Sequence, residues 1–217
     1  MIQEMINGSV GVLSRPSVAT FEEYEKDNLG WALIYSVLAG VINAIISGIQ
    51  FALFPPTPVN PQDLGDVPPE LAELLGGMTT GAAAAPNIWA SVIGAIVFTP
   101  LILLIAWGIT FALGRAFGGD GKFGELAYNM SLFGAPITVI GSVFGLIPFL
   151  GGIAAFALFI YNLYLTYLAI QAGMNLPGNK ALYVILIQFA IGIAIGLCFF
   201  LFFALMIAAL IGAAGGV

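Results

Sequence analysis

Residues 181–207 read ALYVILIQFAIGIAIGLCFFLFFALMI and contain no charged side chain. In an α-helix, about 20 apolar residues at about 1.5 Å each cross a hydrocarbon core about 30 Å thick. Four further runs of this kind, also without Asp, Glu, Lys or Arg, occupy residues 31–53, 89–113, 128–147 and 152–172. The sequence therefore predicts an all-α, polytopic membrane bundle with five transmembrane helices.

The composition is typical of a membrane protein and excludes several kinds of chemistry. Only 7% of the 217 residues are charged, whereas soluble domains have about 25%. The chain has no His and a single Cys, which excludes a disulfide framework, a Cys/His zinc site and His-dependent catalysis. The net charge of -6 disfavours a nucleic-acid partner, which needs a basic surface. We therefore expect no catalytic residue, no metal ligand, no cofactor and no enzymatic activity.

The basic residues predict how the chain is oriented in the membrane. All of them lie outside the apolar runs, and five crossings place them on one side: Arg15, Lys26, Arg115, Lys122 and Lys180. Lys and Arg are retained on the cytoplasmic side of a membrane. We therefore expect a multi-pass protein of the cell membrane, with the N-terminus in the cytoplasm and the C-terminus on the exterior.

The predicted organisation has an N-terminal segment at residues 1–30, cytoplasmic or interfacial, and a transmembrane domain at residues 31–214. The domain includes a Pro-rich external loop at residues 55–87. In the N-terminal segment, Thr20 and Glu23 fit a capping box, which predicts a short helix that runs into the first span. Its carboxylates form either a solvated face or a docking face for a basic protein partner: Glu22, Glu23, Glu25 and Asp27.

Four neutral polar side chains lie near the middle of four different spans, at about the same depth. They are Asn43, Thr99, Thr138 and Asn162. An amide that faces lipid has no hydrogen-bond partner, so both asparagines are expected to point inward. The layer is interpreted either as interhelical hydrogen bonds, worth about 0.6 kcal/mol each, or as a pathway for a small neutral solute.

Prolines and glycines inside the spans indicate where helices bend and where they approach closely. Pro100 and Pro136 are candidate helix hinges, because an internal proline frees a backbone carbonyl and kinks the helix. Two pairs of glycines are spaced four apart and are candidate helix-packing positions: Gly141 with Gly145, and Gly192 with Gly196. Packing within one bundle is the favoured interpretation, and a homo-oligomer is the alternative.

The order of these features resembles the Yip-domain family, the Ypt-interacting integral membrane proteins, over about residues 11–212. The shared features are five spans, a short Gly-containing turn and a proline in the third span. The segments that carry the resemblance are Leu13-Ser14-Arg15-Pro16 with Phe21, Phe117-Gly118-Gly119 to Phe123, Ser131-Leu132-Phe133-Gly134-Ala135-Pro136, Ile147-Pro148-Phe149-Leu150-Gly151, and Tyr161 through Ile170 followed by Lys180-Ala181.

The resemblance implies a lipid-embedded, non-enzymatic protein. The missing catalytic and ion-coupling groups and the closely spaced glycines lead us to expect a membrane scaffold or a partner-recruiting adaptor. Eukaryotic relatives carry a Gly-Tyr pair where this chain has Ser131 and Leu132, so the chain looks like a prokaryotic-type member. The binding of prenylated GTPases by those relatives is not carried over. A channel or facilitator for a small neutral solute, using the midplane layer, is the alternative function.

Overall fold

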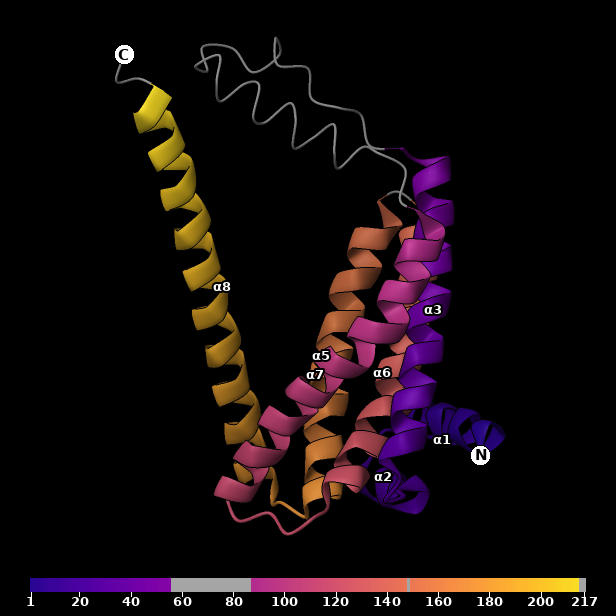
Figure 1. Cartoon of the computed structure of the whole chain (residues 1–217). Coiled ribbons are helices and arrows are strands. Elements are labelled where there is room, and N and C mark those ends of the chain that lie inside the picture. Colours follow the sequence, from indigo (N-terminus) through magenta and orange to yellow (C-terminus); the bar gives the residue numbers. More distant parts are fainter. Residues whose placement is uncertain (56–86, 148, 215–217) are drawn as a thin grey trace. The chain divides into compact units, whose positions relative to one another are not determined.

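The structure, a computed structural model, describes residues 1–55, 87–147 and 149–214. Every regular element in these ranges is an α-helix (Figure 1). The helices are α1 (Ile2–Ser14), α2 (Val18–Tyr24), α3 (Leu29–Leu53), α5 (Ile88–Ala116), α6 (Phe123–Gly145), α7 (Leu150–Met174) and α8 (Gly178–Ala214). Of these, α3, α5, α6, α7 and α8 are long and apolar enough to cross a bilayer, which confirms the predicted all-α membrane bundle.

The N-terminal segment differs from its prediction. It holds two helices, and α2 is capped by Ser17, whose Oγ accepts the backbone N–H of Thr20 at 3.1 Å. The expected capping box of Thr20 and Glu23 is therefore wrong. Nor does α2 run into the first span: it ends at Tyr24, and α3 begins at Leu29. The side chain of Asn28 accepts the backbone N–H of Trp31 at 3.1 Å, which satisfies one open donor of the new helix.

The chain divides into two units that are described separately. The first comprises Met1–Ile49 and Asn87–Gln188, and the second comprises Gln50–Pro86 and Phe189–Val217. In the second unit, the described part of α8 carries exposed apolar side chains such as Phe199, Phe200 and Phe202. An apolar surface of this kind suits contact with lipid. The predicted Pro-rich loop falls almost wholly on residues 56–86, which lie outside the described residues.

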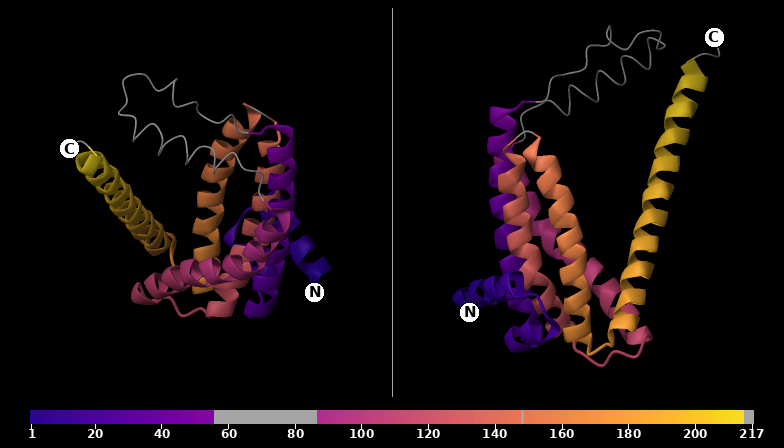
Figure 2. Two further views of the ribbon diagram at one scale, coloured as in Figure 1. Left: turned by 45° about the horizontal axis from the view of Figure 1, so that its top comes forward. Right: turned by 180° about the vertical axis from the view of Figure 1, so that it is seen from behind.

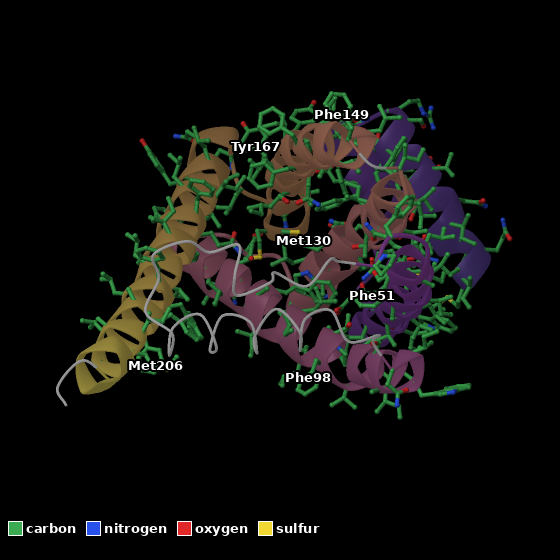
Figure 3. The ribbon with its side chains drawn as sticks, turned by 90° about the horizontal axis from the view of Figure 1, so that it is seen from above. Phe51, Phe98, Met130, Phe149, Tyr167 and Met206 are labelled. Carbon is green, nitrogen blue, oxygen red and sulfur yellow. The ribbon has the colours of Figure 1, made fainter. Side chains whose placement is uncertain are left out.

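The core of the first unit is built around α6, the most buried of the five long helices and the least apolar. Its Leu126, Tyr128 and Leu132 are almost fully buried. Figure 3 shows Met130 inside the bundle, whereas Phe98 and Phe149 lie on its outside. A helix that neighbouring helices shield from lipid does not need an apolar side chain at every position, so α6 can carry polar groups such as Asn129.

Helices α1 and α2 pack onto the end of this bundle, and α1 lies across the direction of the long helices (Figure 2). Met5, Val12 and Phe21 are almost fully buried beneath them. The Phe21 ring meets the Phe133 ring of α6 edge to face, with centroids 6.0 Å apart, an arrangement that aromatic pairs prefer. The N-terminal segment is therefore part of the folded core.

Candidate functional site

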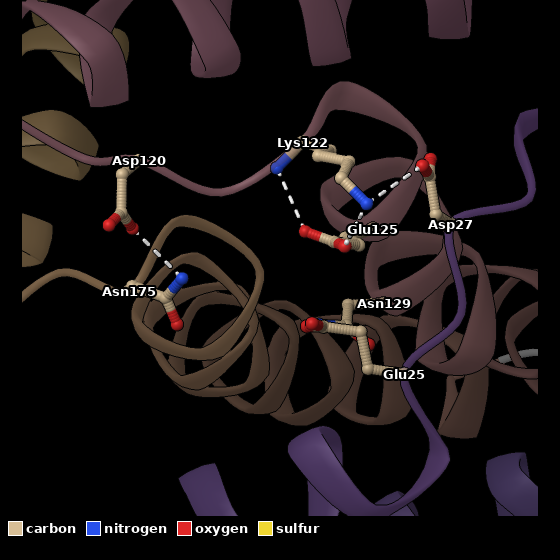
Figure 4. A network of polar contacts seen from close by, with 7 residues as sticks. All are labelled: Glu25, Asp27, Asp120, Lys122, Glu125, Asn129 and Asn175. Carbon is tan, nitrogen blue, oxygen red and sulfur yellow. Dashed lines mark hydrogen bonds and ion pairs between the residues drawn. The ribbon is translucent and has the colours of Figure 1, made fainter.

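Seven polar residues from four segments meet at the end of the first unit where α2 lies (Figure 4). The segment between α2 and α3 provides two of them, the loop between α5 and α6 provides two, α6 provides two, and the last closes α7. We call this set the polar cluster: Glu25, Asp27, Asp120, Lys122, Glu125, Asn129 and Asn175.

Lys122 joins two of these segments. Its Nζ lies 3.3 Å from Oδ2 of Asp27 and 3.4 Å from Oε1 of Glu125, and its backbone N–H donates to Oε2 of Glu125 at 2.9 Å. Hydrogen bonding to Asp27, and then to Glu125, raises the pKa of Lys122. Exposed ion pairs stabilise a fold by only about 0–1 kcal/mol. Lys122 therefore chiefly fixes the position of the segment between α2 and α3. The hydrogen bond from the backbone N–H of Lys122 to Glu125 also caps the beginning of α6. The helix therefore begins at Phe123, before the predicted start at residue 128.

Asn129 is the most buried polar member of the cluster, with 0% of its surface exposed. Its Nδ2 donates to Oε2 of Glu25, whereas its Oδ1 has no hydrogen-bond partner among the described residues. Burial raises the pKa of the Glu25 carboxyl. The hydrogen bond from Asn129 lowers it in part, and the nearby charges of Glu125 and Glu22 raise it further. Glu25 is therefore a half-buried carboxylate that accepts a hydrogen bond from the amide of Asn129.

The pKa shift of Glu25 predicts how stability depends on pH. Since the folded protein binds this proton more readily than the unfolded chain, the contribution of Glu25 to stability is greatest below its ordinary pKa of 4.5 and is lost as the pH rises through its folded value. We expect Glu25→Gln, which is neutral and keeps an oxygen for Asn129, to unfold at a higher temperature than the wild type at about pH 7 and at nearly the same temperature at about pH 4. Thermal unfolding in detergent, followed by circular dichroism, measures both.

The matched control is Glu23→Gln, which neutralises an exposed carboxylate on the same segment. It should not reproduce the higher unfolding temperature expected of Glu25→Gln at about pH 7. If Glu25→Gln had the pH profile of the wild type, Glu25 would not be the group responsible.

The loop between α5 and α6 is held tightly against the end of α7. The backbone N–H of Asp120 donates to the carbonyl oxygen of Met174 at 3.2 Å, and Nδ2 of Asn175 donates to Oδ1 of Asp120 at 2.9 Å. Asn175 has φ 51°, a left-handed conformation that asparagine tolerates at a helix end. A Cβ on Gly121 would lie 2.7 Å from the carbonyl carbon of Gly173, so only glycine fits there.

Two hydroxyl groups fasten α1 to the bundle. Oη of Tyr161 donates to the carbonyl oxygen of Leu13 at 2.6 Å, and Oγ of Ser9 lies 2.9 Å from Oη of Tyr35. These bonds tie α1 to α7 and α3, beside the buried contacts of Met5. Together with the buried side chains, these hydrogen bonds hold the N-terminal segment in a fixed position over the polar cluster.

Comparison with known proteins identifies the family. A family model described as the Yip1 domain matches residues 10–200, well over half of the chain. The chain belongs to the Yip1 domain family. The resemblance seen in the sequence is thereby confirmed, and the protein is a multi-pass membrane protein. Neither the curated proteins nor the solved structures include a significant match. The matched range includes the whole polar cluster, which makes the cluster a feature of this Yip1 domain.

The midplane residues of this Yip1 domain are not joined by hydrogen bonds to one another within the described ranges. Thr138 is exposed and donates to the carbonyl oxygen of Gly134 in its own helix at 2.9 Å. Thr99 lies where α5 approaches α3, with its Oγ1 3.0 Å from the place of a Cβ on Gly40. Asn43 and Asn162 are partly exposed. A shared role for the four residues stays a prediction.

The predicted hinges lie inside helices, Pro100 in α5 and Pro136 in α6. Figure 1 shows that α5 changes direction part-way along its length. A hinge motion stays a prediction at both positions.

The predicted packing glycines fall into two groups. In the first unit, a Cβ on Gly141 would lie 3.7 Å from Leu158, and the Cα of Gly145 would lie 3.2 Å from a Cβ on Gly151. This pair therefore lies where α6 and α7 approach each other. In the second unit, Gly192 and Gly196 have open space around them in the described part of the chain. A contact between copies at these positions stays a prediction.

Sequence reasoning did not single out Asn129 and Gln188, two polar side chains that form hydrogen bonds to other segments of the bundle. Asn129 belongs to the predicted third span, and Gln188 belongs to the run quoted at the outset. Nε2 of Gln188 donates to Oγ1 of Thr110 at 2.6 Å, which ties α8 to α5. Both residues are amides among apolar neighbours, which is the signal that identifies them.

Proposed function

We propose that this Yip1 domain protein is a non-enzymatic adaptor of the cell membrane that recruits a protein partner through α2. The carrying observation is that α2 presents two exposed carboxylates, Glu22 and Glu23, on a helix held in place by the buried side chains of Thr20 and Phe21. We call Glu22 and Glu23 the acidic edge. The predicted orientation places this edge in the cytoplasm.

The other carboxylates near the acidic edge are already engaged within the chain. Glu4 lies 3.1 Å from Nζ of Lys26, which lowers the pKa of Glu4, and Asp27 pairs with Lys122. Within the described ranges, no ion pair involves Glu22 or Glu23. These two charges are therefore available to a basic segment of another protein.

The packing of α2 on the bundle suits its acidic edge for binding a partner rather than only for contact with water. Helix α2 contacts α7, and Phe21 fills the core beside Phe133. A recognition surface that is already rigid loses little conformational entropy when a partner binds. Complementary charge would mainly increase the rate and selectivity of that encounter.

Site-specific photocrosslinking in native membranes tests the proposal. A photoreactive amino acid at Ala19, which is exposed on α2, should give a discrete protein adduct. Glu22→Gln with Glu23→Gln should reduce its yield several-fold, because the basic partner loses its charge complement. The matched control is Gln3→Lys with Asn7→Lys, which changes the net charge by the same amount on α1 and should leave the adduct in place.

Two outcomes would contradict the proposal. One is the absence of any protein adduct at position 19. The other is an adduct that both double variants reduce equally, since this would show a dependence on overall charge rather than on the acidic edge. The solute pathway through the midplane layer stays the alternative prediction.

A further inference from the structure

We propose that α1 is an in-plane membrane helix, whose apolar stripe of Ile2, Ile6 and Val10 inserts into the lipid layer beside the bundle. This inference is independent of the adaptor function, which concerns α2. Four-residue spacing places these side chains on one face of the helix. They are 43%, 42% and 61% exposed, although Met5 and Val12 on the same helix are almost fully buried.

The directions of its contacts show which way the stripe faces. Gly8 and Gly11 lie against Tyr24 of α2, and Glu4 pairs with Lys26 just beyond α2. At about 100° per residue, Ile2 and Ile6 point to the opposite side of α1 from these positions. The stripe therefore faces away from the charged segment that follows α2.

The bond of α1 to α3 indicates its depth, counted from the start of α3, which follows the charged Asp27 closely and is taken as the membrane surface. Ser9 lies 2.9 Å from Oη of Tyr35, and Tyr35 comes six residues after the start of α3 at Leu29. This corresponds to about 9 Å along the helix. Because side chains lean toward the N-terminus of their helix, α1 lies somewhat nearer the membrane surface. In-plane helices sit about 5–10 Å into the boundary between headgroups and acyl chains.

The beginning of α3, which lies next to α1, also carries exposed apolar side chains. Figures 1 and 2 show α1 lying across the spans near the beginning of α3. Along that part of α3, Ile34 and Leu38 are 48% and 42% exposed. On a membrane-spanning helix, such side chains face lipid. The stripe therefore lies near exposed apolar side chains of a membrane-spanning helix, which favours lipid as its occupant.

The rest of the exposed face of α1 is polar without being basic. Nε2 of Gln3 donates to Oδ1 of Asn7 at 3.3 Å, and the helix contains no Lys or Arg. Attraction to anionic headgroups needs such residues. Insertion of α1 therefore depends on the apolar stripe and should be independent of the lipid charge.

Fluorescence quenching in liposomes tests this inference. After Cys198 is replaced by Ala, an environment-sensitive fluorophore is attached through Ile6→Cys or Val10→Cys, with Gln3→Cys and Asn7→Cys as matched controls on the polar face. A nitroxide lipid labelled near the headgroup should quench the labels at 6 and 10 several-fold more than those at 3 and 7. Aqueous iodide should show the reverse order, and added phosphatidylserine should change neither.

The same experiment can overturn the inference in two ways. Iodide that quenches all four labels equally would show that the stripe is in water. Labels at 6 and 10 that are shielded from both quenchers, together with disulfide-linked dimers of the unlabelled Ile6→Cys protein, would show that a second copy covers the stripe.

Discussion

Gly121→Ala is expected to be among the most destabilising single substitutions in this Yip1 domain. The added Cβ would lie 2.7 Å from the carbonyl carbon of Gly173, 2.8 Å from the Cα of Met174, and closer still to the carbonyl oxygen of Gly173. These are backbone atoms at the end of α7, so no rotamer change relieves the overlap. Relief requires the loop between α5 and α6 to move away from α7. We expect a loss of about 3 kcal/mol in the free energy of unfolding, the upper part of the range for overpacking.

The loop movement should be visible beyond the stability itself. It would lengthen the bonds that Asp120 makes with Met174 and Asn175. Denaturant titration in mild detergent measures the free energy, and proteolysis of the loop measures its exposure. The matched control is Gly134→Ala in α6, where an added Cβ has nothing within 4 Å. The control should be neutral or slightly stabilising, since alanine favours helix. Equal stabilities of the two variants would contradict a close contact between Gly121 and the end of α7.

Asn129→Leu is the second substitution expected to have a large effect. Leucine has the branched side-chain skeleton of asparagine, although it is bulkier, and it cannot donate to Glu25, so the half-buried carboxylate loses its hydrogen bond. We expect a loss of about 1–3 kcal/mol at neutral pH, the usual cost of leaving a buried polar group without its partner. The variant also removes the unpartnered Oδ1 of Asn129, which offsets part of the loss. We therefore expect a value in the lower half of that range.

Two comparisons separate this mechanism from general damage to the core. The loss should shrink as the pH falls through the raised pKa of Glu25 in the folded protein and be smallest below its ordinary pKa of 4.5, because protonation removes the charge that needs a partner. It should also shrink in the Glu25→Gln background, in which no carboxylate is present. A double-mutant cycle measures this coupling. A loss that is independent of both pH and residue 25 would show that Asn129 matters only through its shape.

The acidic residues of the N-terminal segment show which contacts the sequence alone cannot predict. The sequence predicts a single face for Glu22, Glu23, Glu25 and Asp27, because spacing and charge are all that it offers. The structure separates them: Glu25 turns to the buried Asn129 and Asp27 to Lys122, whereas Glu22 and Glu23 stay exposed. The division depends on the end of α2 at Tyr24, which redirects the chain after that residue.

Helix α1 is a second feature that the sequence pattern does not predict clearly. Met5, Ser9 and Val12 recur with helical spacing and form its buried face. Ile2, Ile6 and Val10 recur with the same spacing on another face. With two apolar faces and few charges, the segment has no strong contrast between a core side and a water side, which is the contrast that sequence patterns detect.

The five apolar helices and their approximate ends follow from the amino-acid sequence alone. Crossing a bilayer depends on the summed hydropathy of about 20 consecutive residues, a property that is local and additive along the chain. The tertiary structure alone decided which polar groups meet, as with Glu25 and Asn129, 104 positions apart. Such a contact depends on how α2, α6 and α7 pack together, and no window of sequence contains both partners.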